Sequence, residues 1–128
     1  MSQDPIIIFV CEHGAAKSII AAAYFNKFAR ERNLGVHAIA RGTQPDSELS
    51  PITVAGLYRD GLTPNESIPQ KLSTADIESA QKIISFCELP GEYKKKVIVE
   101  QWNDIPAVSN DYEKARGVIV AKLHELIK

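Results

Sequence analysis

The chain has almost no net charge and very few cysteines, and each shortage excludes a class of protein. Fifteen basic and sixteen acidic residues give a formal net charge of −1, so no overall positive field favours nucleic acid or an acidic membrane surface. Its two cysteines lie far apart, which is more typical of reduced thiols with a redox or catalytic use than of a structural disulfide or a zinc site. We therefore expect a small solute as partner, with neither a metal nor an organic cofactor.

Long apolar runs are absent as well. The polar opening Met-Ser-Gln-Asp-Pro is followed by only five consecutive apolar residues, too few for a signal-peptide core or a membrane span. We therefore expect a soluble protein of the cytoplasm. Hydrophobic residues make up 45% of the chain, enough for a real core, and no linker, repeat or low-complexity tract divides it. Residues 1–128 are expected to form one domain.

What the sequence does contain is an alternation of apolar runs with helical patterns. Strands are predicted at 6–10, 36–40, 82–87 and 97–102. Helices are predicted at 16–32, closed by Asn33-Leu34-Gly35, at 51–57 after a Ser50 cap, from 74 onwards, and at 109–128. Strands joined by helices indicate an α/β fold with a parallel sheet and right-handed crossovers.

Several reactive side chains follow the predicted strands. Cys11 comes after the first strand, a loop that begins at Arg41 follows the second, Cys87 closes the third, and Asp104 follows the fourth. In open α/β sheets, ligands bind outside the carboxyl ends of the strands. These residues are therefore expected to meet at one edge.

Cys11 stands where a strand gives way to a long helix. A helix start offers unpaired backbone N–H groups and the positive end of the macrodipole, which favour a thiolate and a tetrahedral oxyanion beside it. Cys11 is therefore a candidate nucleophile. The alternative is that this cysteine is a small apolar filler at the end of a buried strand.

Four stretches carry a resemblance to a known superfamily. Residues 10–18, Val-Cys-Glu-His-Gly-Ala-Ala-Lys-Ser, resemble the phosphate loop of the low molecular weight protein tyrosine phosphatases, in which cysteine is followed after five residues by Arg-Ser. The other three stretches are Arg41-Gly42-Thr43 with Pro45, residues 83–87, and residues 101–107. Together with His13, these matches are similar to the thioredoxin-coupled arsenate reductases of that superfamily.

The resemblance implies both a fold and a site. The fold is a single-domain three-layer sandwich, a four-stranded parallel sheet in the order 2-1-3-4 flanked by helices. The implied catalytic residues are Cys11, Lys17, Ser18, Asp104 and Cys87. The implied oxyanion-binding residues are Glu12, His13, Gly14, Ala15, Ala16, Lys17, Ser18 and Arg41.

This sequence departs from the superfamily pattern in three places. Lys17 replaces the loop arginine, Gly14 stands where asparagine is usual, and Asp104-Ile105-Pro106 replaces an Asp-Pro pair. An ammonium is a compact point charge, whereas a guanidinium grips two oxyanion edges with a planar fork. Our hypothesis is that Arg41, from the adjacent loop, reaches over the anion and supplies the missing guanidinium.

The resemblance leaves three functions open. In the first, Cys11 attacks arsenate or a phosphoryl group, and Cys87 then forms a disulfide with it that thioredoxin or a small thiol reduces. The third cysteine common in that branch is absent, so Cys11–Cys87 would be the terminal disulfide. The second is a low molecular weight protein tyrosine phosphatase acting on a phosphorylated substrate, and the third is a catalytically impaired oxyanion-binding or interaction module.

Several of these residues also have a purely structural interpretation. Lys17 could be a solvated residue of the first helical turn, and Ser18 could be a local cap. His13 could face solvent, Asp104 could cap a turn, and Cys87 could fill space at a strand end.

Overall fold

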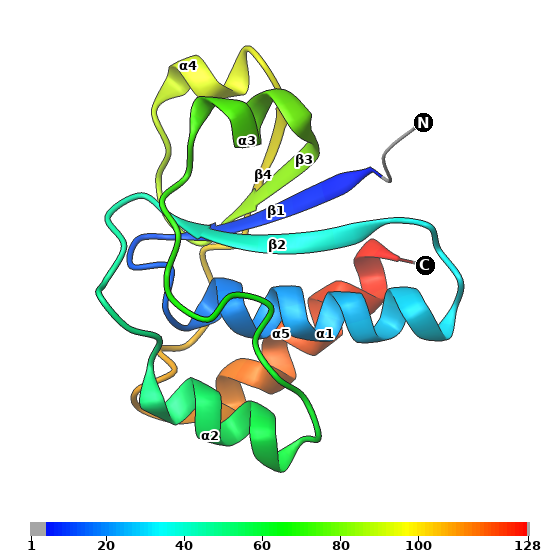
Figure 1. Ribbon diagram of the computed structural model, residues 1–128, viewed down its shortest axis with the longest axis vertical. Helices are drawn as coiled ribbons and strands as arrows, with labels where there is room; N and C mark the ends of the chain where they lie inside the picture. Colours follow the sequence, from blue (N-terminus) through cyan, green and yellow to red (C-terminus); the bar gives the residue numbers. More distant parts are fainter. Residues whose placement is uncertain (1–4, 128) are drawn as a thin grey trace.

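The strands form one parallel sheet in the order that the resemblance implies. The structure, a computed structural model, describes residues 5–127. Its strands are β1 (Ile6–Cys11), β2 (His37–Gly42), β3 (Ala80–Ser85) and β4 (Ile98–Gln101), in the order β2-β1-β3-β4 (Figure 1). The helices are α1 (Lys17–Glu31), α2 (Pro51–Arg59), α3 (Thr74–Ser79), α4 (Gly91–Lys94) and α5 (Tyr112–Leu126). The predicted α/β sandwich is confirmed.

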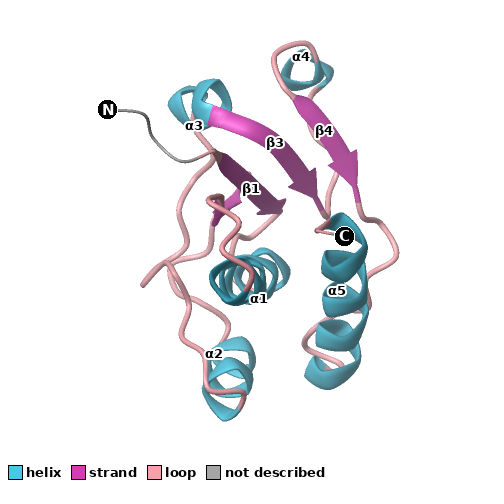
Figure 2. Cartoon of the chain, turned by 90° about the vertical axis from the view of Figure 1, so that its right-hand side faces the viewer, coloured by secondary structure: helices cyan, strands magenta, loops and turns pink. Residues whose placement is uncertain are grey.

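Helices cover both faces of the sheet (Figures 1 and 2). Helices α1 and α5 lie against one face with α2 beyond them, and α3 and α4 lie on the other. Strand β1 is buried on both sides: Phe9 belongs to the core cluster on the α1 face, and Ile8 and Val10 to the cluster on the α3 face. Burying each such side chain stabilises the fold by about 1.5–3 kcal/mol. The double burial explains why β1 is a continuous apolar run.

The outer edge of β2 is covered by the irregular segment 65–72. The Asn65 side chain donates to the Ala38 carbonyl at 2.8 Å, and the Ala40 N–H donates to the Glu66 carboxylate at 3.0 Å. Backbone bonds then join Gly42 to Gln70 and Leu72. Because these groups satisfy the polar atoms of the edge, the strand is protected from pairing with another chain.

The observed element boundaries differ from the predicted ones in ways that move site residues. Strand β2 extends through Arg41 and Gly42, because Gly42 pairs with Cys11 of β1. Strand β3 ends at Ser85, so Cys87 lies in the bend beyond it rather than on the strand. Helix α4 was not predicted, and the end of the last predicted helix at 128 lies outside the described residues, as do residues 1–4 of the predicted domain.

Helix ends follow local capping rules. The Ser50 hydroxyl accepts from the Thr53 N–H at 3.3 Å with Pro51 in the first turn, as the sequence predicts. The last helix begins at Tyr112 rather than at 109, because the Asp111 side chain accepts from the Lys114 N–H. Helix α1 ends at Glu31 and is capped by Arg32, and the next residue, Asn33, has a left-handed φ of 54°, so asparagine rather than glycine holds the position just after the cap.

A polar cluster joins the three helices on the α1 face. The Asp60 carboxylate accepts from the Tyr24 hydroxyl at 2.6 Å and the Tyr112 hydroxyl at 2.9 Å, and Arg116 pairs with its other oxygen at 2.9 Å. Burial and the neighbouring carboxylate raise the pKa of Tyr24 to about 12. A side chain at Gly56 would overlap the Tyr112 ring, so α2 and α5 pack closely at this point.

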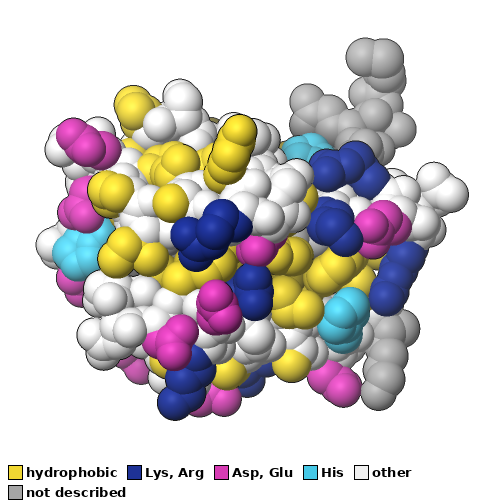
Figure 3. All heavy atoms as spheres, turned by 90° about the horizontal axis from the view of Figure 1, so that it is seen from below, with side chains coloured by type: hydrophobic (Ala, Val, Ile, Leu, Met, Phe, Trp, Pro, Cys, Tyr) yellow, Lys and Arg dark blue, Asp and Glu magenta, His cyan; other side chains and the backbone are white. Residues whose placement is uncertain are grey.

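The outward side of α2 exposes apolar side chains. Ile52, Val54 and Tyr58 are exposed on this helix. Figure 3 shows the molecule from this side, where hydrophobic side chains lie among basic and acidic ones. Among the helices within residues 5–127, none has the length and apolar character needed to cross a membrane.

Thr53 offers a test of the packing beneath α2. Its side chain is fully buried, and its hydroxyl oxygen has no hydrogen-bond partner. Thr53→Val replaces the unpaired hydroxyl with a methyl group of similar shape, so we expect the free energy of unfolding to rise by about 1 kcal/mol in urea titrations. The control Thr63→Val, at an exposed position, is expected to change it by less than about 0.5 kcal/mol. A lower stability for Thr53→Val would contradict this description of the core.

Candidate active site

A small pocket opens at the carboxyl edge of the sheet. Figure 1 shows the path of the chain at this edge, where β1 leads into α1. The volume of the pocket is about 280 Å³. It is lined by Cys11, Glu12, His13, Ala16, Lys17, Phe86 and Cys87. Six of these seven are predicted site residues, and Phe86 is the one that sequence reasoning did not single out. The two cysteines, 76 positions apart in the chain by their numbers, 11 and 87, therefore share one cavity.

The loop between β1 and α1 turns its carbonyl groups towards the segment that follows β2. Backbone N–H groups of residues 43, 44, 46 and 50 donate to the carbonyl oxygens of residues 11, 12, 13 and 15, at distances of 2.7–3.3 Å. These four bonds hold the loop in one conformation. They also fix the direction of its peptide groups, because the C=O and N–H of one trans peptide lie in the same plane and point in opposite directions.

The N–H groups of the same loop are left without partners. Within the described part of the chain, the backbone N–H groups of residues 12–18 donate to no backbone or side-chain acceptor. The residue that caps α1 is Ala16, which has no side chain able to accept from the first turn. Unpaired N–H groups at the start of a 15-residue helix form a site suited to an anion.

Two glycines hold this loop against the sheet. Gly14 has a left-handed φ of 62°, and a Cβ there would lie 2.9 Å from the Gly42 nitrogen. A Cβ at Gly42 would lie 2.7 Å from the Gly14 nitrogen. The backbones therefore touch at a point that no side chain can occupy. Gly42 belongs to one of the stretches that carry the resemblance but was given no role, although a glycine two positions after a predicted strand was an available signal.

The Cys11 sulfur has a hydroxyl partner. Its Sγ lies 3.0 Å from the Ser18 Oγ, and both side chains are buried. The Ser18 side chain reaches back from the first turn of α1 to the end of β1. A hydroxyl at this distance can donate to a thiolate and stabilise it.

Cys87 reaches the pocket from a distant part of the sequence, in the bend after β3. Burial raises the pKa of the Cys87 thiol, and the nearby Cys11 sulfur raises it further, while hydrogen bonds from Ser85 and Thr43 act in the opposite direction. Both cysteines are free thiols in the structure. The site therefore holds two reduced sulfurs in one pocket.

The charged residues at the pocket are few. Lys17 is the one basic side chain among the lining residues that the structure describes. His13 is held between two carboxylates, with Nε2 3.2 Å from Glu12 and Nδ1 3.2 Å from Asp46. Within residues 5–127, no three His, Cys, Asp or Glu side chains gather where they could bind a metal ion.

Arg41 does not reach the pocket, contrary to our hypothesis. Its guanidinium lies 3.0 Å from Asp76 and 3.2 Å from Glu66, and it also donates to the Ala40 carbonyl at 2.8 Å. Since Arg41 belongs to β2, side-chain alternation sends it away from the face of Ala40 and Gly42. Among the described residues that line the Cys11 pocket, none therefore supplies a guanidinium in place of the loop arginine.

Asp104 also lies outside the pocket lining. Its carboxylate pairs with Lys122 at 3.1 Å and is well exposed. The hydrogen bond from Lys122 lowers the pKa of Asp104 below its ordinary value. A carboxyl that is ionised and paired with a lysine of α5 is poorly placed to protonate a leaving group, so this geometry does not support a role for Asp104 as the general acid among the implied catalytic residues.

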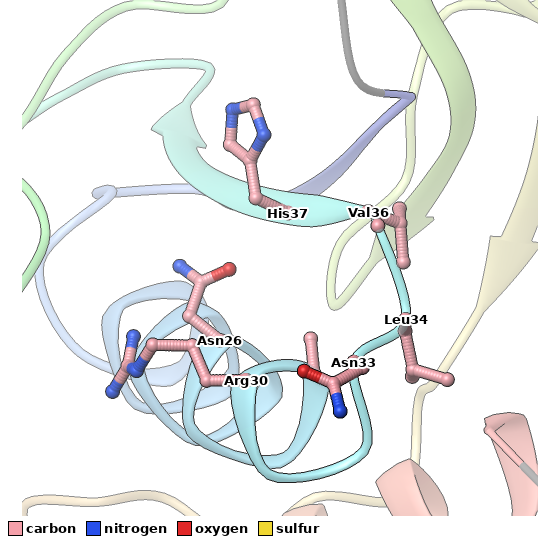
Figure 4. Close-up of a pocket in the computed structure, with 8 residues that line it drawn as sticks. Asn26, Arg30, Asn33, Leu34, Val36 and His37 are labelled. Atoms are coloured by element: carbon pink, nitrogen blue, oxygen red, sulfur yellow. The ribbon is translucent and has the colours of Figure 1, made fainter.

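A larger hollow lies at the other end of β2, close to the end of α1 (Figure 4). Asn26 reaches from α1 towards β2 there, and its amide bonds both the N–H and the carbonyl of Ala38, at 2.7 and 2.9 Å. Both ends of this amide are used in joining helix to strand. Because the hollow contains no cysteine, the Cys11 pocket is the better candidate for the chemistry.

Comparison with known proteins agrees with this geometry. The low molecular weight phosphotyrosine protein phosphatase family matches residues 6–114. The comparison with curated proteins finds no match.

Among solved structures, the fold is similar to a YwlE mutant from Bacillus subtilis, with 20% identity, a TM-score of 0.80 and 95% of each chain covered. It is also similar to a thioredoxin-dependent arsenate reductase from Corynebacterium glutamicum, with 22% identity and a TM-score of 0.71, covering 99% of this chain and 65% of that one. A low molecular weight protein tyrosine phosphatase from T. tengcongensis has 17% identity, a TM-score of 0.78 and coverage of 96% and 97%. With the family match over most of its length, the chain belongs to the low molecular weight phosphotyrosine protein phosphatase family.

Proposed function

We propose that the protein is a thiol-dependent arsenate reductase, with Cys11 as the nucleophile and Cys87 as the second, resolving thiol. The observation that carries this proposal is that two free cysteines line one small pocket beside unpaired backbone N–H groups. A phosphatase of this kind needs one sulfur, whereas reduction of arsenate needs two electrons, which a pair of thiols supplies when it becomes a disulfide.

In the first step, the Cys11 thiolate attacks the arsenic atom of arsenate. One arsenate oxygen takes up protons from solvent and leaves as water, and a sulfur–arsenic bond forms. The N–H groups of residues 12–18 hold the remaining oxygens, Lys17 balances their charge, and the Ser18 hydroxyl stabilises the thiolate before attack. Arsenic stays in the pentavalent state in this adduct.

In the second step, the Cys87 thiolate attacks the Cys11 sulfur. The electron pair of the sulfur–arsenic bond passes to arsenic, arsenite leaves, and a Cys11–Cys87 disulfide forms. Arsenic gains two electrons and each sulfur loses one, so the step balances. An external dithiol such as thioredoxin, or a small thiol, then reduces the disulfide and is oxidised in turn.

Dephosphorylation of a phosphorylated substrate is the second candidate function. The same N–H groups and Cys11 suit a phosphoryl group, and the family match supports this candidate. Ester cleavage, however, needs a proton on a leaving alkoxide or phenoxide, and Asp104 is exposed and paired with Lys122. Arsenate brings exchangeable protons on its own oxygens, so its reduction depends less on a positioned acid.

Cys87→Ser separates the two functions. We expect this change to lower arsenite production from arsenate and a dithiol by about 10²-fold or more, because no second sulfur is left to form the disulfide. Hydrolysis of an aryl phosphate, which does not use Cys87, should stay within about threefold of the original rate. Full arsenite production by Cys87→Ser would contradict the reductase proposal. Tight arsenate binding with neither activity in the unaltered protein would leave only an oxyanion-binding module.

A further inference from the structure

Each of the two sulfurs in the pocket has a serine hydroxyl as its neighbour. Ser18 lies 3.0 Å from the Cys11 sulfur, and the Ser85 Oγ lies 3.6 Å from the Cys87 sulfur. Ser85 is fully buried and is the last residue of β3, two positions before the cysteine. The family resemblance gave no role to this serine.

The Ser85 hydroxyl holds the bend that carries Cys87. It donates to the Cys87 carbonyl oxygen at 2.5 Å and accepts from the Cys87 N–H at 3.2 Å. Three atoms of Cys87 therefore surround one buried oxygen: the nitrogen, the carbonyl oxygen and the sulfur. This arrangement restricts the position of the thiol more than the bend alone would.

The Cys87 carbonyl has a second donor. The Gln101 side-chain nitrogen donates to it at 3.2 Å, and Gln101 of β4 is the register partner of Ser85 in β3. The Ser85 hydroxyl can therefore rotate from this carbonyl towards the sulfur without leaving the carbonyl unpaired. Such a rotation changes the partner of one proton and requires no backbone movement.

We propose that Ser85 is the positioning residue of the second thiol: its hydroxyl turns from the Cys87 carbonyl to the Cys87 sulfur when that thiol ionises, while Gln101 keeps the carbonyl satisfied. This inference rests on the proposed role of Cys87. The ionised sulfur faces the Cys11 sulfur, Glu12, His13 and Lys17 within the pocket, and Thr43 supplies a further hydroxyl. Burial raises the pKa of the Cys87 thiol, and a hydrogen bond donated to its thiolate acts in the opposite direction, so such a donor favours the ionised form that attacks.

The test measures how fast the Cys11–Cys87 disulfide closes, by acid quench and mass spectrometry. Two oxidants are used separately. Arsenate forms the adduct described above. Hydrogen peroxide converts Cys11 to a sulfenic acid with release of water, and the Cys87 thiolate then displaces hydroxide from that sulfur to form the disulfide.

We expect Ser85→Ala to slow closure by about tenfold or more at neutral pH with either oxidant, and to move the pH profile of closure upwards. Ser85→Thr, which keeps the hydroxyl, should restore closure to within about threefold. The matched control Ser79→Ala removes an exposed hydroxyl that bonds only the Asp76 carbonyl and should leave closure unchanged.

Closure by Ser85→Ala at the original rate with peroxide would overturn the proposal. So would an equal slowing in Ser85→Thr and Ser85→Ala without a shift of the pH profile, since that result assigns Ser85 to packing alone. If the disulfide of the unaltered protein closes with peroxide but not with arsenate, the reductase function is contradicted, while the role of Ser85 is still tested by the peroxide reaction.

Discussion

Cys11→Ser is expected to lower the turnover of arsenate, or of an aryl phosphate, by about 10⁴-fold or more. The oxygen of serine is a far weaker nucleophile than a thiolate near neutral pH, and the other thiol of the pocket, Cys87, lies in the bend after β3 rather than in the loop of N–H groups. The Ser18 hydroxyl, 3.0 Å from the Cys11 sulfur, is placed to donate to a thiolate but is itself a weak nucleophile. Steady-state assays of arsenite and of aryl alcohol release provide the measurement.

The same variant separates catalysis from binding. The N–H groups of residues 12–18 belong to the backbone and remain in place when the sulfur is replaced. Phosphate or arsenate affinity, measured by calorimetry, should therefore stay within about threefold of the original value. Turnover retained by Cys11→Ser would show that the chemistry lies elsewhere, whereas lost affinity would show that the sulfur itself holds the anion.

Gly42→Ala is expected to reduce turnover by about 10²-fold or more and to destabilise the fold by about 1–3 kcal/mol. The added Cβ would lie 2.7 Å from the Gly14 nitrogen, 2.8 Å from the Gly14 Cα and 2.9 Å from the His13 carbonyl carbon. All three are backbone atoms, so the loop has to move away from the sheet. A displaced loop no longer aims its N–H groups at the same point.

Gly117→Ala is the matched control for this change. Gly117 lies within α5, and a Cβ there would meet nothing within 4 Å. In the helix interior alanine is favoured over glycine, so we expect stability to rise by about 0.5–1 kcal/mol with turnover unchanged. Circular dichroism and urea unfolding report stability, and the arsenite assay reports turnover. Normal turnover in Gly42→Ala would contradict the view that the glycine contact shapes the oxyanion site.

Much of the fold could be predicted from local patterns. The run from Ile6 to Val10 is buried on both faces, and that double burial is the reason for its unbroken apolar sequence. Ser50 and Pro51 mark the start of α2 by capping chemistry alone. Boundaries set by pairing between distant strands were harder to predict. Strand β2 runs on to Gly42 because Cys11 offers it a partner.

The candidate site was predictable where its residues are consecutive and less so where they depend on distant partners. Residues 11–17 lie together because one loop carries them. We expected Arg41 to reach the anion, but its side chain pairs with Glu66 and Asp76 instead. These two residues are distant in sequence, so no local pattern predicts the pairing. The direction of the Asp104 side chain likewise depends on its ion pair with Lys122, a residue of the later helix α5. The catalytic roles themselves stay predictions.

The most direct measurement is mass spectrometry of the reduced protein after incubation with arsenate and, in a separate sample, with an aryl phosphate. The account predicts that arsenate removes two hydrogens from the intact mass, with Cys11 and Cys87 recovered in one disulfide-linked peptide pair. A phosphoryl group gained from the aryl phosphate, without any arsenate-dependent disulfide, would favour the phosphatase instead. An unchanged mass in both samples would contradict the claim that Cys11 attacks a bound oxyanion.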